Sequence, residues 1–477
     1  MMMTKKYILN LIISWITLSL GAHTLYAQEK KEVQYGPVSP EKRTDPAMEK
    51  WRDNRFGQFI HWGLYAIPAG YWKGKYYKGA AEWLKSWAKV PMNEWAKLAE
   101  EFNPEQYDPE EWASMAKQMG ARYVVLTTKH HEGFCLWPSQ YTDFDISNTP
   151  YQKDLLKPFV EAYNKAGIDV YFYYSVLDWY HPDWRYALKS EEDKQAFERF
   201  KTFTKNQLSE LIERYPSVKG FWFDGTWDAS WKASGQFSYE LEKHMKQLKP
   251  GLIINSRMRA DEWGSRHFDS NGQMMGDYAS GWERKLPTDT SVLHNDWEAC
   301  MTVPENQWGY HKNWEGHVKT PTELIEMMVR CTALSGNFLL NFGPKEDGSI
   351  REEEQLLVKE IGNWMEQYGN AIYNCAYAGL EKQDWGYFTR EPGSKTVNMV
   401  VCNIPVNKAL RIQLPKNLFI QHYEYMGKPL SKLTLEEIGK NEYFIHLGKV
   451  KTKQPFVINI QLTSEKTDNG LYQKAKT

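Results

Sequence analysis

Polar, charged and aromatic residues follow six apolar segments in the first 300 residues of the chain. Asp224 and Gly225 come directly after the segment 220–223, and His61 follows 57–60. In a barrel of parallel strands, the carboxyl ends of the strands carry the chemistry. A single residue of this kind could be a helix cap or an ion-pair partner, but packing alone does not explain six such segments. The other four are followed by Lys129, His130, His131 and Glu132; Ser175, Asp178 and Trp179; Asn255, Ser256 and Arg257; and His294, Asp296, Trp297 and Glu298.

Carboxyl groups in this set point to glycoside hydrolysis. A retaining glycosidase needs an ionised carboxylate as nucleophile and a protonated carboxyl as acid, about 5–5.5 Å apart. Asp224 suits the first role, because Gly225 after it leaves room for a ligand. Aromatic residues make up 15% of the chain, with 21 Trp, and aromatic faces pack well against the apolar faces of sugar rings. The second carboxyl must come from a later segment, where Glu283 and Glu298 are the main candidates and Asp269 and Asp277 the weaker ones.

The run His130-His131-Glu132 raises the alternative of a metal site. Adjacent strand residues point to opposite faces, so a tandem histidine pair at a strand end is a poor chelator. The chain has no H-E-x-x-H motif of a zinc peptidase and no G-x-S-x-G motif of a serine hydrolase. We therefore expect no catalytic metal and no other cofactor.

Alternating apolar segments and amphipathic helical patterns predict the α/β fold class. About seven strands favour a (β/α)8-like barrel of the TIM type over an open doubly wound sheet, and the first strand lacks the G-x-G-x-x-G of a dinucleotide fold. Helix starts are marked by Asp108-Pro109 and by the capping box Thr320 to Glu323. Expected strands are 57–60, 123–128, 169–174, 220–223, 252–255, 292–295 and 337–341. Expected helices are 92–101, 109–119, 154–166, 191–214, 239–248 and 321–333.

The pattern changes after about residue 370 to short alternating segments between polar turns. The segments 397–403, 409–414, 421–426, 443–447 and 455–462 are typical of strands in a small antiparallel β-sandwich. We therefore divide the chain into a signal peptide (1–27), a catalytic (β/α)8-like barrel (28–370), a C-terminal β-sandwich (371–465) and a flexible tail (466–477).

The N-terminus predicts export. Lys5 and Lys6 precede the apolar run 8–20, and Ala27 is a small residue suited to a cleavage site. A membrane anchor is the alternative, but the run is short and interrupted by polar residues. The chain has no N-x-[ST] sequon, which leans toward a bacterial periplasm or the cell exterior. We expect no membrane association after cleavage.

Charge and cysteine content exclude other classes of protein. A net charge of -1 over 477 residues gives no electrostatic basis for binding nucleic acid. The five cysteines are scattered and odd in number, which argues against a disulfide scaffold or a zinc ribbon. The oligomeric state is not encoded in any pattern that we find.

Several motifs resemble those of the α-L-fucosidases of glycoside hydrolase family 29. The resemblance runs from about Trp51 to Gly369, and the sandwich after it also fits. The motifs are specific as a set. They are RFGQFIHWG (55–63), YVVLTTKHHEGF (123–134), WFDG (222–225), WE (297–298), WGY (308–310) and NFLLN (337–341).

The resemblance implies a retaining exo-glycosidase that releases terminal α-L-fucosyl units from a fucosylated oligosaccharide or glycoconjugate. It implies Asp224 as the nucleophile. It favours Glu283, in the loop before Arg284, as the acid/base; Glu298 is the alternative and would otherwise anchor the loop beneath the site. Around the sugar it places His61, Glu82, Trp83, His130, His131, Tyr173, Trp222 and Arg257.

Three other interpretations stay open at the level of sequence. A non-catalytic fucose-binding protein on the same fold would keep the histidines and lose a carboxylate. A glycosidase for a related sugar, such as an α-L-galactoside, would differ in the shape of the pocket around one hydroxyl. A metal-dependent hydrolase would lose activity with EDTA. The linkage preference, α1,2, α1,3, α1,4 or α1,6, depends on loops that the motifs do not describe.

Overall fold

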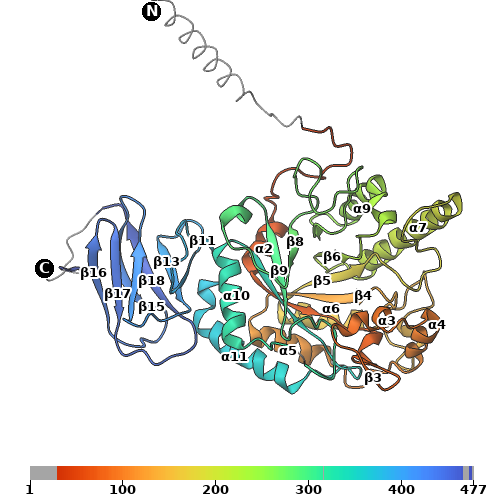
Figure 1. Ribbon diagram of the computed structural model, residues 1–477, viewed down its shortest axis with the longest axis horizontal. Helices are drawn as coiled ribbons and strands as arrows, with labels where there is room; N and C mark the ends of the chain where they lie inside the picture. The colour runs from red at the N-terminus through yellow and green to blue at the C-terminus, as the bar shows by residue number, and fades with distance from the viewer. Residues whose placement is uncertain (1–29, 315, 466–471, 475–477) are drawn as a thin grey trace, which may run out of the picture.

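The computed structural model describes residues 30–314, 316–465 and 472–474. The signal peptide expected at 1–27 lies outside the described residues. The chain forms an α/β barrel, and two antiparallel sheets lie beside it along the long axis of the molecule (Figure 1). No helix in the described ranges is long and apolar enough to span a lipid bilayer.

Eight parallel strands form the barrel sheet, which confirms the predicted fold class. Their order is β7-β6-β5-β4-β1-β10-β9-β8. Hydrogen bonds from Asp277 N to Ile254 O (2.8 Å) and from Ser256 N to Tyr278 O (2.9 Å) join the two ends of this order, so the sheet curls into a TIM-like barrel. The strands are β1 (Phe56–Ile60), β4 (Tyr123–Lys129), β5 (Asp169–Ser175), β6 (Gly220–Asp224), β7 (Ile253–Ile254), β8 (Ala279–Glu283), β9 (Trp297–Thr302) and β10 (Asn337–Phe342).

Helices on the outside of the barrel connect most of the strands (Figure 1). The longer ones are α2 (Pro46–Asn54), α5 (Pro109–Met119), α6 (Leu156–Ala166), α7 (Glu191–Arg214), α9 (Gly235–Leu248), α10 (Pro321–Ala333) and α11 (Glu352–Tyr368). Short elements in the loops are η1 (Leu64–Ala66), β2 (Tyr71–Trp72), β3 (Lys75–Tyr76), η2 (Ala81–Trp83), α3 (Leu84–Trp87), α4 (Met92–Trp95), η3 (Ala96–Glu100), η4 (Ile146–Asn148), α8 (Ala229–Lys232) and η6 (Gly369–Ala371).

The expected helix starts are confirmed. The Asp108 carboxylate accepts hydrogen bonds from the backbone of Glu110 and Glu111 (2.9 and 3.1 Å), and Pro109 takes the first helical position of α5. Thr320 and Glu323 form the predicted capping box of α10. Caps of this kind satisfy backbone donors that the helix itself leaves free.

The region around β8 and β9 departs from the prediction. The strand expected at 292–295 is wrong: Thr290–His294 forms the short 3-10 helix η5, which starts where the Asp289 side chain accepts from Ser291 N (2.8 Å). The true strands lie on either side of η5. The segment that contains β9 is buried throughout, whereas Val292 and Leu293 are only half-buried. Residues 255–278, all described, contain no helix, so β7 and β8 are joined by a long irregular loop.

Two antiparallel sheets follow the barrel. The orders are β11-β12-β13-β18-β15 and β14-β17-β16-β19, and inward-facing residues such as Met399, Ile445 and Ile458 are fully buried. Trp364 Nε1 of α11 donates to Pro455 O (2.7 Å) across the contact with the barrel. The strands are β11 (Ala376–Tyr377), β12 (Gly386–Arg390), β13 (Thr396–Val401), β14 (Ala409–Gln413), β15 (Phe419–Tyr425), β16 (Leu433–Gly439), β17 (Glu442–Leu447), β18 (Phe456–Thr463) and β19 (Tyr472–Lys474).

The expected domain limits can be placed on these elements. The last long helix of the barrel ends at Tyr368 and the first strand beyond it begins at Ala376. Within 466–477, expected as a flexible tail, Tyr472–Lys474 pairs with β16 as β19; the other residues of that segment lie outside the description. All five cysteines are unpaired, and four of them are buried.

Candidate active site

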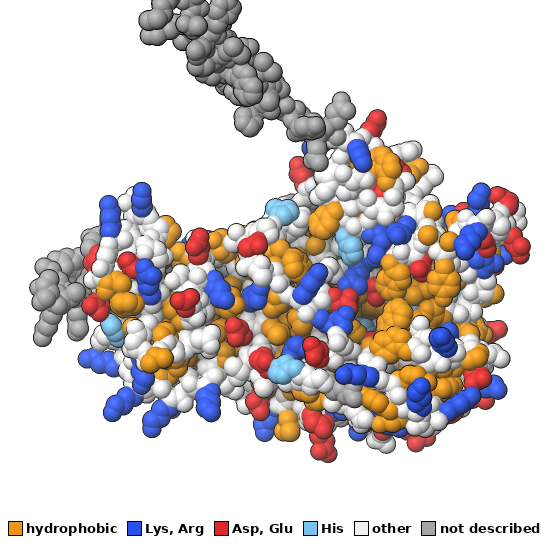
Figure 2. Space-filling view, viewed as in Figure 1, with side chains coloured by type: hydrophobic (Ala, Val, Ile, Leu, Met, Phe, Trp, Pro, Cys, Tyr) orange, Lys and Arg blue, Asp and Glu red, His pale blue; other side chains and the backbone are white. Residues whose placement is uncertain are grey.

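The carboxyl ends of the barrel strands surround a cavity of about 300 Å³. Figure 2 shows charged and histidine side chains gathered in a hollow of the barrel, with hydrophobic side chains at its border. Ten of the eleven residues expected at the site line this cavity: His61, Glu82, Trp83, His130, His131, Tyr173, Trp222, Asp224, Arg257 and Glu283. The eleventh, Glu298, does not.

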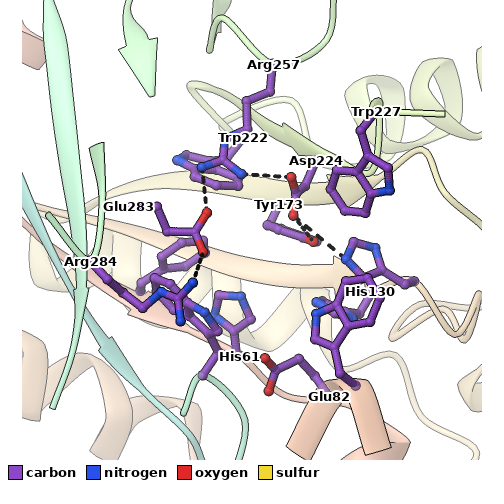
Figure 3. A pocket seen from close by; sticks show the side chains of 14 residues that line it. His61, Glu82, His130, Tyr173, Trp222, Asp224, Trp227, Arg257, Glu283 and Arg284 are labelled. Carbon is purple, nitrogen blue, oxygen red and sulfur yellow. Dashed lines mark hydrogen bonds and ion pairs between the residues drawn. The ribbon is translucent and has the colours of Figure 1, made fainter. Parts of the chain in front are cut away.

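Arg257 bridges the two candidate carboxyl groups. Its Nη1 lies 2.9 Å from Asp224 Oδ1 and its Nη2 lies 2.8 Å from Glu283 Oε2 (Figure 3). The guanidinium also lies over the ring of Trp222, 4.4 Å from its centroid, which is a favourable cation–π geometry. Because one planar group binds both carboxyls through two of its nitrogens, Asp224 and Glu283 face the same space. Glu283 is the last residue of β8, not part of a loop as expected.

Asp224 is held as a carboxylate. Burial by itself would raise its pKa, but Arg257 and then His131 outweigh burial and the pKa is lowered. Tyr173 OH donates to Asp224 Oδ2 (3.1 Å), and His131 Nε2 lies 3.9 Å from the same oxygen. A carboxylate that is ionised at neutral pH and open to a cavity is suited to nucleophilic attack.

His130 and His131 both line the cavity, so the expectation that they point to opposite faces is wrong. β4 ends at Lys129 and its pairing with β5 is irregular between Thr127 and Lys129, so the strand alternation does not continue into the histidines. Neither does a metal site follow: among the described residues, no three His, Cys, Asp or Glu side chains are grouped to hold an ion.

The pocket histidines are neutral hydrogen-bonding groups. Burial lowers the pKa of His61 to about 3 and of His131 to about 4, and lowers that of His130 well below its usual range. Asn341 Oδ1 holds His61 Nδ1 at 2.7 Å, and Ser175 Oγ lies 2.6 Å from His131 Nδ1. These contacts fix the orientation of the His61 and His131 rings, whereas the buried Nδ1 of His130 has no hydrogen-bond partner among the described residues.

Glu82, in η2, lies across the cavity from Asp224 and Arg257 (Figure 3). Its Oε2 accepts from Gly309 N (3.0 Å), whereas the buried Oε1 has no protein partner. Burial raises the pKa of Glu82 to about 7, against the effect of the Gly309 hydrogen bond. A carboxyl of this kind can donate to or accept from a hydroxyl that enters the cavity.

Glu298 lies beneath the cavity rather than in it. As the second residue of β9 it accepts from Tyr123 OH (2.7 Å) and Trp222 Nε1 (2.9 Å). Glu298 therefore fixes the Trp222 indole, over which the Arg257 guanidinium lies. The weaker candidates are also structural: Asp277 pairs with Lys246 (2.8 Å) and Asp269 caps a turn through Asn271 N (2.8 Å).

Four further residues line the cavity that sequence reasoning did not name as site residues. Phe59 lies two residues before His61 on β1, so strand alternation could have found it. Trp308 stands in one of the recognised motifs, and its carbonyl accepts from Asn341 Nδ2 (2.7 Å). The other two, Trp227 and Arg284, follow Asp224 and Glu283 closely along the chain, but lie in loops with no periodic pattern.

A parallel barrel with paired carboxyl groups, neutral hydrogen-bonding side chains and aromatic walls at its carboxyl end defines a glycoside hydrolase of the two-carboxylate class. A family model described as alpha-L-fucosidase matches residues 23–370. The chain therefore belongs to the alpha-L-fucosidase family, as the motifs predicted.

Individual relatives agree with this assignment. The tissue alpha-L-fucosidase of Rattus norvegicus is 30% identical over 357 residues, which are 71% of this chain and 72% of the relative. The structure of a family 29 alpha-L-fucosidase from Bacteroides thetaiotaomicron is 54% identical with a TM-score of 0.88, over 91% of this chain and 98% of that chain. A second structure from that organism, with the same identity and TM-score over 90% and 99% of the two chains, is a covalent intermediate trapped with 2-fluoro-fucosyl fluoride in a glutamate-to-glutamine variant.

We expect Glu298→Gln to flatten the pH dependence of stability. Burial raises the pKa of Glu298 from 4.5 to about 7, although Tyr123 and Trp222 oppose the rise. The folded state thus keeps a proton that the unfolded state has lost, so this stabilisation is full below about pH 4.5 and disappears as the pH rises through about 7. The free energy of unfolding of the unmodified protein should fall by on the order of 2 kcal/mol more than that of the variant between pH 5 and 8.

Urea unfolding at the two pH values measures this difference. Glu366→Gln, on the exposed face of α11, is the matched control and should keep the dependence of the unmodified protein. Equal pH dependence in Glu298→Gln would show that Glu298 does not hold a proton in the folded state.

Proposed function

We propose that the protein releases terminal α-L-fucosyl units from glycans through a covalent intermediate on Asp224, with Glu283 as the acid/base. The observation that carries the proposal is the Arg257 bridge, which aims both carboxyl groups into one cavity. The membership of the alpha-L-fucosidase family and the covalent fucosyl intermediate of a relative support it.

The reaction has two steps. In the first, an Asp224 oxygen attacks the anomeric carbon while the bond to the leaving oxygen breaks, and Glu283 gives its proton to that oxygen. In the second, Glu283 takes a proton from water, the water oxygen attacks the anomeric carbon, and the ester to Asp224 breaks. Two inversions give fucose with the configuration of the substrate.

The other pocket residues are proposed to bind the sugar. The neutral rings of His61, His130 and His131 and the free oxygen of Glu82 face the cavity with open hydrogen-bonding positions, which match the alternating hydroxyls of a sugar. Trp83 and Trp222 offer apolar surfaces, and Tyr173 and Arg257 position Asp224. The partner of the site is thus a fucosylated oligosaccharide or glycoconjugate.

The stereochemical course tests the two-step scheme. The first product of hydrolysis followed by proton NMR should be the α anomer of fucose, and Asp224→Ala should lose several orders of magnitude in kcat/KM while its circular dichroism stays unchanged. Initial release of the β anomer, or near-normal activity of Asp224→Ala, would refute the nucleophile assignment.

Azide rescue of aryl α-L-fucoside hydrolysis tests the acid/base. An aryl leaving group barely needs protonation, so Glu283→Ala should complete the first step, stall at the second, and recover with azide as α-L-fucosyl azide. Glu298→Ala is the matched control, because its side chain holds Trp222 from below, and it should gain nothing from azide. Rescue of Glu298→Ala instead of Glu283→Ala would move the acid/base and leave the nucleophile in place.

We also propose that the chain is exported, to a bacterial periplasm or the cell exterior. Support comes from Lys5, Lys6 and the apolar run 8–20 before Ala27. The full chain, expressed in a bacterial host and recovered from the periplasm, should have the mass of a chain that begins after Ala27. A chain lacking residues 1–27 is the control and should stay in the cytoplasm. Recovery of the uncleaved chain from the cytoplasm would contradict export.

A further inference from the structure

A second cavity of about 340 Å³ adjoins the first. The two share Glu283, Arg284, Glu82, Trp83 and Trp308 as lining residues. Glu283 therefore lies at the boundary between them. If Glu283 protonates the leaving oxygen, the group attached to that oxygen must extend to the Glu283 side of the first cavity. The second cavity opens on that side.

We propose that the second cavity is the subsite for the leaving group, and that Trp87 is the platform on which the sugar ring next to fucose stacks. This inference rests on the proposed function, since it uses Glu283 as the acid. The ligand is a neutral pyranose of a glycan chain, with its apolar face on the indole and its hydroxyls toward the polar wall.

Trp87 has the position and the exposure that this role needs. It ends α3, four residues after Trp83, and side chains at this spacing lie on the same side of a helical turn. Trp83 lines both cavities, whereas Trp87 lines only the second. Trp87 is 45% exposed, although tryptophans at the core of the barrel are almost fully buried.

The backbone at Gly79 supports the indole. Gly79 has a φ of +110°, and a Cβ at this position would lie 2.4 Å from two carbons of the Trp87 ring. Only glycine allows this approach. The ring is thus held against the backbone on one side and open on the other, which lowers the conformational entropy that binding would cost.

The polar wall comes from the loops after β8 and β9. Arg284, next to Glu283, donates to Asn306 Oδ1 and places its Nη2 3.7 Å from Glu283 Oε1. Arg284 and Asn306 therefore join the two loops across the cavity. Their remaining donors are available to sugar hydroxyls.

Two kinds of substrate distinguish an effect on this subsite from an effect on the fucose pocket. In α-L-fucosyl fluoride the leaving group is one atom and cannot reach Trp87, whereas in a fucosyl disaccharide it is a whole ring. The disaccharide is the one that the unmodified protein hydrolyses fastest among the α1,2, α1,3, α1,4 and α1,6 isomers. We expect Trp87→Ala to lower kcat/KM on this disaccharide about tenfold or more, with less than a twofold change on the fluoride.

Two further variants complete the experiment. Trp87→Phe keeps an aromatic face and should restore most of the disaccharide activity. Trp263→Ala removes an indole that is 53% exposed and lies outside both cavities, and should change neither rate. Equal losses of Trp87→Ala on both substrates, or no loss on either, would overturn the subsite. The same holds if the unmodified protein cleaves the fluoride and no disaccharide. Failure of the unmodified protein on every fucoside would instead overturn the proposed function.

Discussion

Two carboxyl groups that face one buried cavity repel each other when both are ionised, and Arg257 separates Asp224 from Glu283 in this structure. Its guanidinium binds both through a rigid fork, and its attraction, together with the effects of His131 and of a backbone hydrogen bond from Gly225, outweighs the effect of burial on the pKa of Asp224. Without this cation, burial would favour a protonated Asp224, and an acid cannot attack an anomeric carbon. The chemistry of the site therefore depends on one ion-paired network.

The position of Arg257 depends in turn on the interior of the barrel. Its guanidinium lies over Trp222, the Trp222 indole donates to Glu298, and Glu298 also accepts from Tyr123. The Tyr123 ring fills the space beside Gly57, where a Cβ would lie 2.4 Å from a ring carbon. Because Gly57 has no side chain, the Tyr123 ring fits beside β1 and reaches Glu298. Through Glu298 and the Trp222 indole, this contact supports Arg257.

Burial also determines how the site recognises a neutral ligand. The three histidines are buried, and burial lowers the pKa of each so that the rings are neutral at neutral pH. Asn341 and Ser175 fix the orientation of two of the rings. Neutral imidazoles with fixed orientation discriminate hydroxyl positions through hydrogen-bond geometry. The charges of the site are confined to the side where the bond is broken.

Local sequence patterns determined the class of fold, most of the helices and the end of the barrel at which the site forms. Periodicity and caps are properties of neighbouring residues, so α5, α7 and α10 were predicted with their limits unchanged, and the order of motifs placed ten residues at one cavity. The strand predicted at 292–295 was wrong because a short apolar run is compatible with both a strand and a 3-10 turn. Which of the two forms depends on whether the segment is buried in the barrel, and burial depends on residues far away in the chain.

The resemblance favoured Glu283 over Glu298 as the acid/base, but only the tertiary structure shows that Glu283 reaches the cavity and Glu298 does not. Both follow a tryptophan, and both lie on adjacent strands. Glu283 ends β8 and reaches the cavity, whereas Glu298 is near the beginning of β9 and lies below it. Depth along a strand follows from the register of the sheet, and register is set by pairing between residues far apart in the chain. The same reason explains Trp87, whose exposure beside Glu283 depends on how the loop after β1 folds over the barrel.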